Sequence, residues 1–290
     1  MKLIQIILLI LTLNNCRHYF VRDAAKYNLT QEEENILKSK KIGVVGFHPF
    51  YTSKYNGCCG EQTSQLLSKD LIRALQFIYE KNDSEQIPSD PDYFVTTIMM
   101  KDRIEQSLSD VDTSKVYFKF GEKVEKSKTT KPDTSISEKN LRQFLKTYLD
   151  ETRHLGYKDI IEPLDFSDKN KVYLQKNDFE FWIIGFHSPR DYEPNIKVLF
   201  TFLPFACSFG VIPLWSEDKI KSSFWIFDKK LNLFKKIEME NKYDYFAASW
   251  LYWKWKTESK MQSDPPIEVY EPDLKEFQKE LVQIMKNKVD

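Results

Sequence analysis

The chain has 290 residues, of which 41% are hydrophobic and 14% aromatic, and this is enough to fill one large core or two small ones. Its 43 basic and 43 acidic side chains balance, so net charge does not attract nucleic acid, and we expect no nucleic-acid partner. Only 8 residues are glycine, and no phosphate-binding loop of the GxxxxGK[ST] or GxGxxG type follows a predicted strand. The aromatic content favours a core that contains strands.

Residues 1–16 have the pattern of a secretory leader. Lys2 forms a short basic region, and the apolar stretch Leu3–Leu13 that follows is too short to span a bilayer comfortably. The leader ends at Cys16 rather than at a small-x-small cleavage site. A plain signal anchor and a buried N-terminal helix are the alternative interpretations.

The end of this leader, Leu13-Asn14-Asn15-Cys16, resembles the lipobox of bacterial lipoproteins, in which the cysteine is diacylated and becomes the mature N-terminus. Asn15 departs from the Gly, Ala or Ser usual before that cysteine, although some bacterial lineages use relaxed boxes. The resemblance implies a signal peptide over residues 1–16 and lipid attachment at Cys16. It also implies a location in the bacterial cell envelope, with the outer membrane favoured over the inner, and an envelope protein as partner.

Behind the leader we expect an α/β or α+β fold, with a mixed sheet, flanking helices and a strand-rich C-terminal half closed by a C-terminal helix. The expected division is a tether over 17–28, an α/β unit over 29–160 and the strand-rich half over 161–290. The two larger parts can form one domain. Aromatic and β-branched runs predict the strands, and apolar residues at helical spacing predict the helices.

The elements expected in the first half alternate between helix and strand. In chain order they are a helix from the Thr30–Glu33 capping box to about Lys40, a strand over Lys41–Phe50, a helix over Glu61–Tyr79, strands over Tyr93–Met100 and Val116–Phe120, and a helix behind a Ser135–Glu138 capping box. Residues 40 to 100 resemble the first unit of α/β domains in bacterial envelope-assembly lipoproteins, including the curli-secretion type, and the N-terminal domain of the Tol-associated periplasmic protein. This resemblance carries no catalytic residue.

Two predicted strands end in nearly the same sequence. Val44-Val-Gly-Phe-His48 is echoed by the end of Phe181-Trp-Ile-Ile-Gly-Phe-His187. Short apolar motifs recur freely, so chance is the default interpretation, and two similar strands that end at one sheet edge are the alternative. Because a Gly lets a strand bend and a following Pro ends it, we expect both histidines at strand termini. Parallel neighbours would bring both to the edge where α/β sheets place ligands.

A second apolar stretch, Val198–Trp215, is about long enough to span a bilayer. Pro204, Gly210 and Pro213 interrupt it, and its aromatic and β-branched content predicts buried strands with an intervening turn. A membrane span and a contact with an apolar partner or lipid are the alternatives. Its end, Gly210-Val-Ile-Pro-Leu-Trp215, resembles a pattern of bacterial envelope lipoproteins of uncharacterised family.

The remaining C-terminal elements are predicted from alternation and turn residues. They are strands over Val172–Leu174, Phe179–His187, Lys221–Phe227, Leu231–Met239 and Tyr243–Trp255, turns at Asp228–Leu231 and Glu240–Lys242, and a final helix capped by Asp273. We expect the aromatic residues near Trp253 to cover the core and its edge, with a carbohydrate or peptide platform as the alternative.

The candidate ligand residues are His48, Cys58, Cys59 and His187. Two imidazoles and two thiolates can hold a soft metal in a tetrahedral site. Our preferred interpretation is that the histidines make local hydrogen bonds and that no metal or other cofactor is bound. Cys58 or Cys59 can pair with Cys207 in an oxidising compartment, and buried free thiols are the alternative.

Three functions compete. A lipid-anchored envelope protein with a non-enzymatic assembly, interaction or structural role is favoured by the lipobox and by the absence of a GxSxG elbow or an HExxH helix. The second is a small-ligand or metal-binding module, and the third is a thiol-dependent or hydrolytic enzyme, for example with a Cys58 or Cys59 nucleophile and a His48 base. We assign no catalytic residue.

Overall fold

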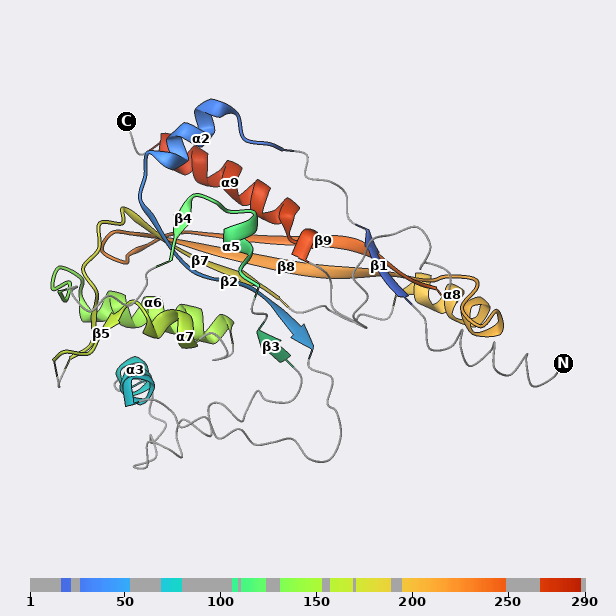
Figure 1. The fold of residues 1–290 in the computed structure, drawn as a ribbon, viewed down its shortest axis with the longest axis horizontal. Helices are drawn as coiled ribbons and strands as arrows, with labels where there is room; N and C mark the ends of the chain where they lie inside the picture. The colour runs from blue at the N-terminus through green and yellow to red at the C-terminus, as the bar shows by residue number, and fades with distance from the viewer. Residues whose placement is uncertain are drawn as a thin grey trace.

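The computed structural model describes residues 17–21, 27–52, 69–79, 106–108, 111–123, 131–152, 157–168, 171–188, 195–248 and 267–287. Within these residues one mixed sheet has helices on both faces (Figure 1). Helices α2 (Gln31–Lys38) and α9 (Glu271–Lys286) cover one face, and α3 (Lys69–Tyr79), α6 (Glu138–Glu151) and α7 (Tyr157–Ile161) cover the other. The expected mixed sheet with flanking helices and a closing C-terminal helix is confirmed.

The sheet has seven strands in the order β1-β9-β8-β7-β2-β3, and β4 also pairs with β2. Their bounds are β1 (Arg17–Val21), β2 (Ile42–Thr52), β3 (Gln106–Leu108), β4 (Gly121–Glu122), β7 (Phe181–His187), β8 (Leu214–Asp228) and β9 (Leu233–Ala248). The pair β2 and β7 is parallel, as is β2 with β4, and the other pairs are antiparallel. Strands from both halves of the chain therefore share one sheet.

The smaller elements lie around this sheet. They are α5 (Thr113–Val116), the strands β5 (Leu164–Asp165) and β6 (Tyr173–Leu174), which form a separate sheet, α8 (Ile196–Cys207) and a 3-10 turn (Ile267–Val269). The predicted stripe on α6 is buried from Leu141 to Leu149, and that on α9 is buried from Leu274 to Met285. The Thr30–Glu33 capping box is present at the start of α2. In α6 and α9 the spacing of apolar residues thus predicts the buried face, and in α2 the cap predicts where the helix begins.

The two Gly-Phe-His motifs lie side by side. Gly46 of β2 is in register with Gly185 of β7, so the two similar strands are parallel neighbours in one sheet, although they do not both end at one edge. A β-bulge follows at once, because Gly46 has φ 84° and Phe47 has φ 65°. An added Cβ on Gly46 would lie 2.4 Å from the Gly185 carbonyl oxygen, and one on Gly185 would lie 2.6 Å from the Phe47 ring. Each motif therefore needs its glycine because the other motif is beside it.

The bulge changes which face each following side chain occupies. Phe47 packs on the α9 face, with ring centroids 5.5 Å from Phe118 and 6.5 Å from Phe277, and His48 points to the opposite face. His187 ends β7 as predicted, but β2 continues to Thr52, so the prediction that His48 ends its strand is wrong. The reason is that the bulge absorbs the bend, after which β2 pairs with β3.

The hairpin of β8 and β9 extends beyond the rest of the sheet. β7 pairs with β8 only from Ser222 onward, whereas β9 pairs with β8 back to Leu214. Beyond β7 the hairpin carries β1 on one side, and α8 packs on β8 at the same end of the molecule (Figure 1). The structure thus has a three-layer body and an arm that ends in α8.

Several predicted elements differ from the structure. Arg17–Val21, expected in a tether, form β1. Thr113–Val116 is a short helix, and the strand expected over Val116–Phe120 is replaced by a turn before β4. The turn expected at Glu240–Lys242 is absent because β9 pairs with β8 through these residues. Ser137, not Ser135, caps α6. The strand over Tyr93–Met100 and the aromatic residues near Trp253 lie outside the described residues.

The glycine pair makes a prediction about stability. Gly46→Ala should lower the free energy of unfolding by at least about 2 kcal/mol, because it adds left-handed strain to a clash with backbone that cannot move aside. Urea denaturation would measure the change, with the exposed Lys139→Ala expected to stay within about 0.5 kcal/mol of the parent. Equal stability of the two variants would contradict this account of the bulge.

Candidate functional site

His48 belongs to a partly buried charged network that joins β2, α6 and α7. Its Nε2 lies 3.1 Å from Asp159 Oδ2 and 3.1 Å from Lys123 Nζ. The Tyr148 hydroxyl donates to Asp159 Oδ2 at 2.6 Å, and Lys123 Nζ pairs with Asp112 Oδ2 at 2.9 Å. Opposite charges thus meet with limited access to water, where hydrogen bonds between the partners offset part of the cost of desolvation.

Burial and neighbours act in opposite directions on Asp159. Burial raises the pKa of its carboxyl, but the hydrogen bond and charge of His48, the charge of Lys123 and the Tyr148 hydrogen bond together hold this pKa below its usual range. Burial beside this carboxylate raises the pKa of Tyr148 well above its ordinary value. The adjoining cavity measures about 10 Å³, which is room for one water molecule. The network is therefore built to hold elements together rather than to admit a substrate.

His187 lies in a second buried network on the face covered by α9. Its Nδ1 is 2.9 Å from Ser222 Oγ, and its Nε2 is 3.1 Å from Thr113 Oγ1. Ser222 donates to Asp273 Oδ2 at 2.5 Å, and Thr113 donates to the Phe47 carbonyl oxygen at 2.7 Å. Each ring nitrogen of His187 therefore has a hydroxyl oxygen within hydrogen-bonding distance.

Ser222, His187 and Asp273 are the residue types of a hydrolytic triad, but they are hydrogen-bonded to one another in a different order. The serine lies between the histidine and the carboxylate, so its proton goes to Asp273 and not to the imidazole. All three side chains are fully buried. This network fixes α9 and α5 to the sheet and offers no accessible nucleophile.

Of the four predicted ligand residues the structure describes His48 and His187, and it does not bring these two side chains together. His48 and His187 make their contacts on opposite faces of the sheet, linked only indirectly through the neighbours Asp112 and Thr113. Cys16, Cys58 and Cys59 lie outside the described residues. In the part of the chain that the structure describes, no group of three or more His, Cys, Asp and Glu residues is arranged to hold a metal.

The end of the arm departs most from the prediction. Val198–Trp215, expected as buried strands, contains most of α8, a turn and the start of β8. Cys207 ends α8 as an exposed free thiol rather than a buried one, and its possible partners Cys58 and Cys59 lie outside the described residues. Large apolar side chains on α8 and the turn are 48% to 74% exposed. We call this set the apolar tip: Ile196, Leu199, Phe200, Phe202, Leu203, Phe209, Val211 and Ile212.

The apolar tip faces outward because the polar side chains of α8 face the sheet. Beyond β7, the backbone groups of β8 on the side away from β9 need other partners. Thr201 Oγ1 accepts from the Trp215 N–H at 3.0 Å, and Asn195 Nδ2 donates to the Glu217 carbonyl oxygen at 2.6 Å. Asn195 also caps α8 by accepting from the Val198 N–H at 3.1 Å. The few polar side chains of α8 and its cap are thus turned toward β8.

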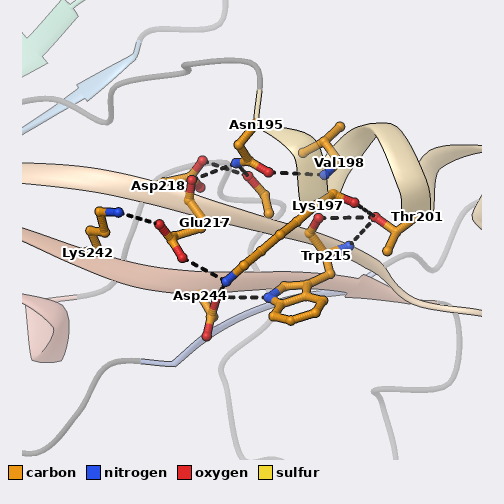
Figure 2. A network of polar contacts seen from close by, with 10 residues as sticks. Asn195, Lys197, Val198, Thr201, Trp215, Glu217, Asp218, Lys242 and Asp244 are labelled. Atoms are coloured by element: carbon orange, nitrogen blue, oxygen red, sulfur yellow. Dashed lines mark hydrogen bonds and ion pairs between the residues drawn. The ribbon is translucent and has the colours of Figure 1, made fainter.

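Charged side chains connect α8 to the β8–β9 hairpin beside the apolar tip (Figure 2). Lys197 reaches from α8 to Glu217 Oε2 at 2.8 Å and Asp244 Oδ1 at 3.0 Å, and its Nζ lies 4.3 Å from the centre of the Trp215 ring. Trp215 Nε1 donates to Asp244 Oδ1 at 2.8 Å, and Lys242 pairs with Glu217 at 2.7 Å. We call these five residues the polar collar. The lysine hydrogen bonds lower the pKa of Glu217 to about 2.

Comparison with known protein families, curated proteins and solved structures found no match to this chain. Within the described residues, no helix is both long enough and apolar enough to cross a bilayer. The candidate functional site therefore rests on geometry alone, and the apolar tip with its polar collar is the feature of the described residues that the packing of the protein itself does not explain.

The buried His187 network makes a prediction about stability. Asp273→Ala should lower the free energy of unfolding by about 3 kcal/mol or more, because the buried Ser222 hydroxyl and the Asn241 amide, 2.6 Å from Asp273 Oδ1, lose their acceptor. Glu276→Ala, at an exposed position of the same helix, is the matched control and should change little. Chemical denaturation measures both, and a small loss for Asp273→Ala would mean that the network does not fix α9.

The polar collar makes a prediction about pH. Since the folded pKa of Glu217 is lowered from 4.5 to about 2, its stabilising contribution is present above pH 4.5 and is lost as pH falls toward about 2. In Glu217→Gln this part of the acid-induced loss should be absent, whereas at neutral pH the variant should melt below the parent. Thermal unfolding from neutral to acid pH tests this, and parallel melting curves of the two proteins would contradict it.

Proposed function

We propose that this protein is a lipid-anchored component of the bacterial cell envelope, attached through Cys16, with a non-enzymatic interaction or structural role. The observation that carries the proposal is the position of β1. This strand begins at Arg17, the residue after Cys16, and its first residue pairs with Ala248 at the end of the arm. A lipid on Cys16 would therefore hold the folded protein at the bilayer by this end, without a long tether.

The buried networks support a non-enzymatic role. Among the described residues, the cavity next to the ionisable cluster around His48 has room for about one water molecule, and the Ser222–His187–Asp273 cluster has no exposed atom for a nucleophile. Both clusters connect helices to the sheet, which is a structural task. We propose the outer membrane over the inner as the location and an envelope protein as the partner.

Cys16→Ala should abolish incorporation of a clickable fatty-acid analogue and should allow alkaline carbonate to extract the protein from membranes without detergent. The reason is that a covalent acyl anchor resists such washing, whereas peripheral contacts do not. Cys207→Ala is the matched control, because it removes the exposed thiol and should leave both readouts unchanged. Persistent labelling of Cys16→Ala would overturn the assignment of the anchor.

A further inference from the structure

We propose that the apolar tip is a second membrane contact, which inserts at the boundary between headgroups and acyl chains of the bilayer. The proposal deepens the proposed anchorage and rests on it for orientation only. We identify lipid as the binding partner of the tip from three observations: the size of the tip, the fixed outward orientation of its side chains and its position next to β1.

The apolar tip is too extensive for an ordinary water-facing surface. It combines eight large side chains that are about half to three-quarters exposed, which amounts to on the order of 800 Å², whereas the largest patch on a typical monomer is about 300–600 Å². From Val198 to Trp215 the sequence contains no charged residue. A surface of this kind marks an interface with lipid or protein.

The outward orientation of the apolar side chains is fixed. Thr201, Asn195 and Lys197 are held by β8 and the polar collar. Rotating α8 to bury Phe200 or Leu203 would break these bonds and leave backbone groups of β8 unpaired, which is costly. The helix therefore presents its apolar face permanently to whatever lies outside the protein.

The position of the tip identifies the bilayer as its occupant. Arg17 pairs with Ala248, and the adjacent Ala247 pairs with Leu214, which follows the exposed turn of the tip. Two strand spacings separate the backbones of Arg17 and Leu214, or about 10 Å, and Cys16 is one Cα step of about 3.8 Å further. An acyl chain on Cys16 would thus enter the membrane beside the apolar tip. Lipidated proteins commonly need such a second attachment for stable binding.

The polar collar sets the depth of insertion. Trp215 and Lys197 are the residue types that lie at the membrane–water boundary, and the lysine keeps its charge at the polar side. Glu217, Lys242 and Asp244 behind them would remain with the headgroups and water. With 12 residues, α8 is about 18 Å long, so it lies in the interface rather than crossing a core of about 30 Å.

Vesicle flotation of the mature chain with Cys16→Ser tests the tip without the lipid anchor. On vesicles of phosphatidylethanolamine and phosphatidylglycerol, this protein should float with the lipid. The double variant Phe200→Glu/Leu203→Glu should lose partitioning by about tenfold or more, because charge is excluded from the acyl region. The matched control is Leu233→Glu/Phe234→Glu, which replaces exposed apolar residues at the other end of β9 and should stay within about twofold.

Circular dichroism and thermal melting of each variant establish that it is folded, as expected for substitutions at exposed positions. The proposal would be overturned if the parent failed to float or if both double variants lost partitioning equally. It would also be overturned if the parent formed a dimer in solution that only the tip variant dissociates, because the tip would then bind a second copy of the chain. Because Cys16 is absent throughout, these results are independent of acylation. Absence of fatty-acid labelling from the parent chain, or its persistence in Cys16→Ala, would remove the anchor but leave the tip to be tested by flotation alone.

Discussion

The arm of this protein depends on how the free edge of β8 is satisfied. A strand that extends beyond its neighbour exposes N–H and C=O groups that must find partners. Here side chains of α8 supply them at Trp215 and Glu217. This arrangement uses the polar residues of the helix, so the apolar residues can only face outward. The exposed tip is thus the direct consequence of edge protection.

The three-layer body gives this tip a rigid base. At the centre of the sheet, Gly46 and Gly185 allow β2 and β7 to approach closely where β2 bulges. Because of the bulge, Phe47 packs in the core under α9, whereas His48 lies in the network on the opposite face. Thr113 bonds to both the Phe47 backbone and His187. Helices on both faces are therefore tied to the same strands.

The sequence predicted those elements that have a strong local signal. The apolar stripes of α6 and α9, the capping box of α2 and the continuous apolar run that ends at His187 are such signals, and the structure confirms them. α8 has apolar residues on nearly every side, so periodicity could not separate a helix from buried strands. The signal that could have found it is Asn195, a cap residue three positions before Val198.

Other misses arose where tertiary contacts outweigh local preference. Asn241 and its neighbours favour a turn, yet pairing along the whole of β8 keeps β9 continuous. Asp273 has the residue type of a cap but is drawn into the buried network by Ser222 and Asn241. The polar collar joins Lys197 to Asp244 across a long sequence separation. Its members share no local pattern, so their convergence could be seen only in the fold.

The most direct test of the central claim is the depth of the tip in a bilayer. Cys207 at the end of α8 can carry an environment-sensitive fluorophore in the lipidated full chain, with Cys58→Ser and Cys59→Ser. Brominated lipids should quench this probe most strongly within about 5–10 Å of the boundary between headgroups and acyl chains. A probe at Phe234→Cys, in a chain that also carries Cys207→Ser, should remain unquenched. Emission from Cys207 as in water, with no more quenching than at position 234, would contradict the account.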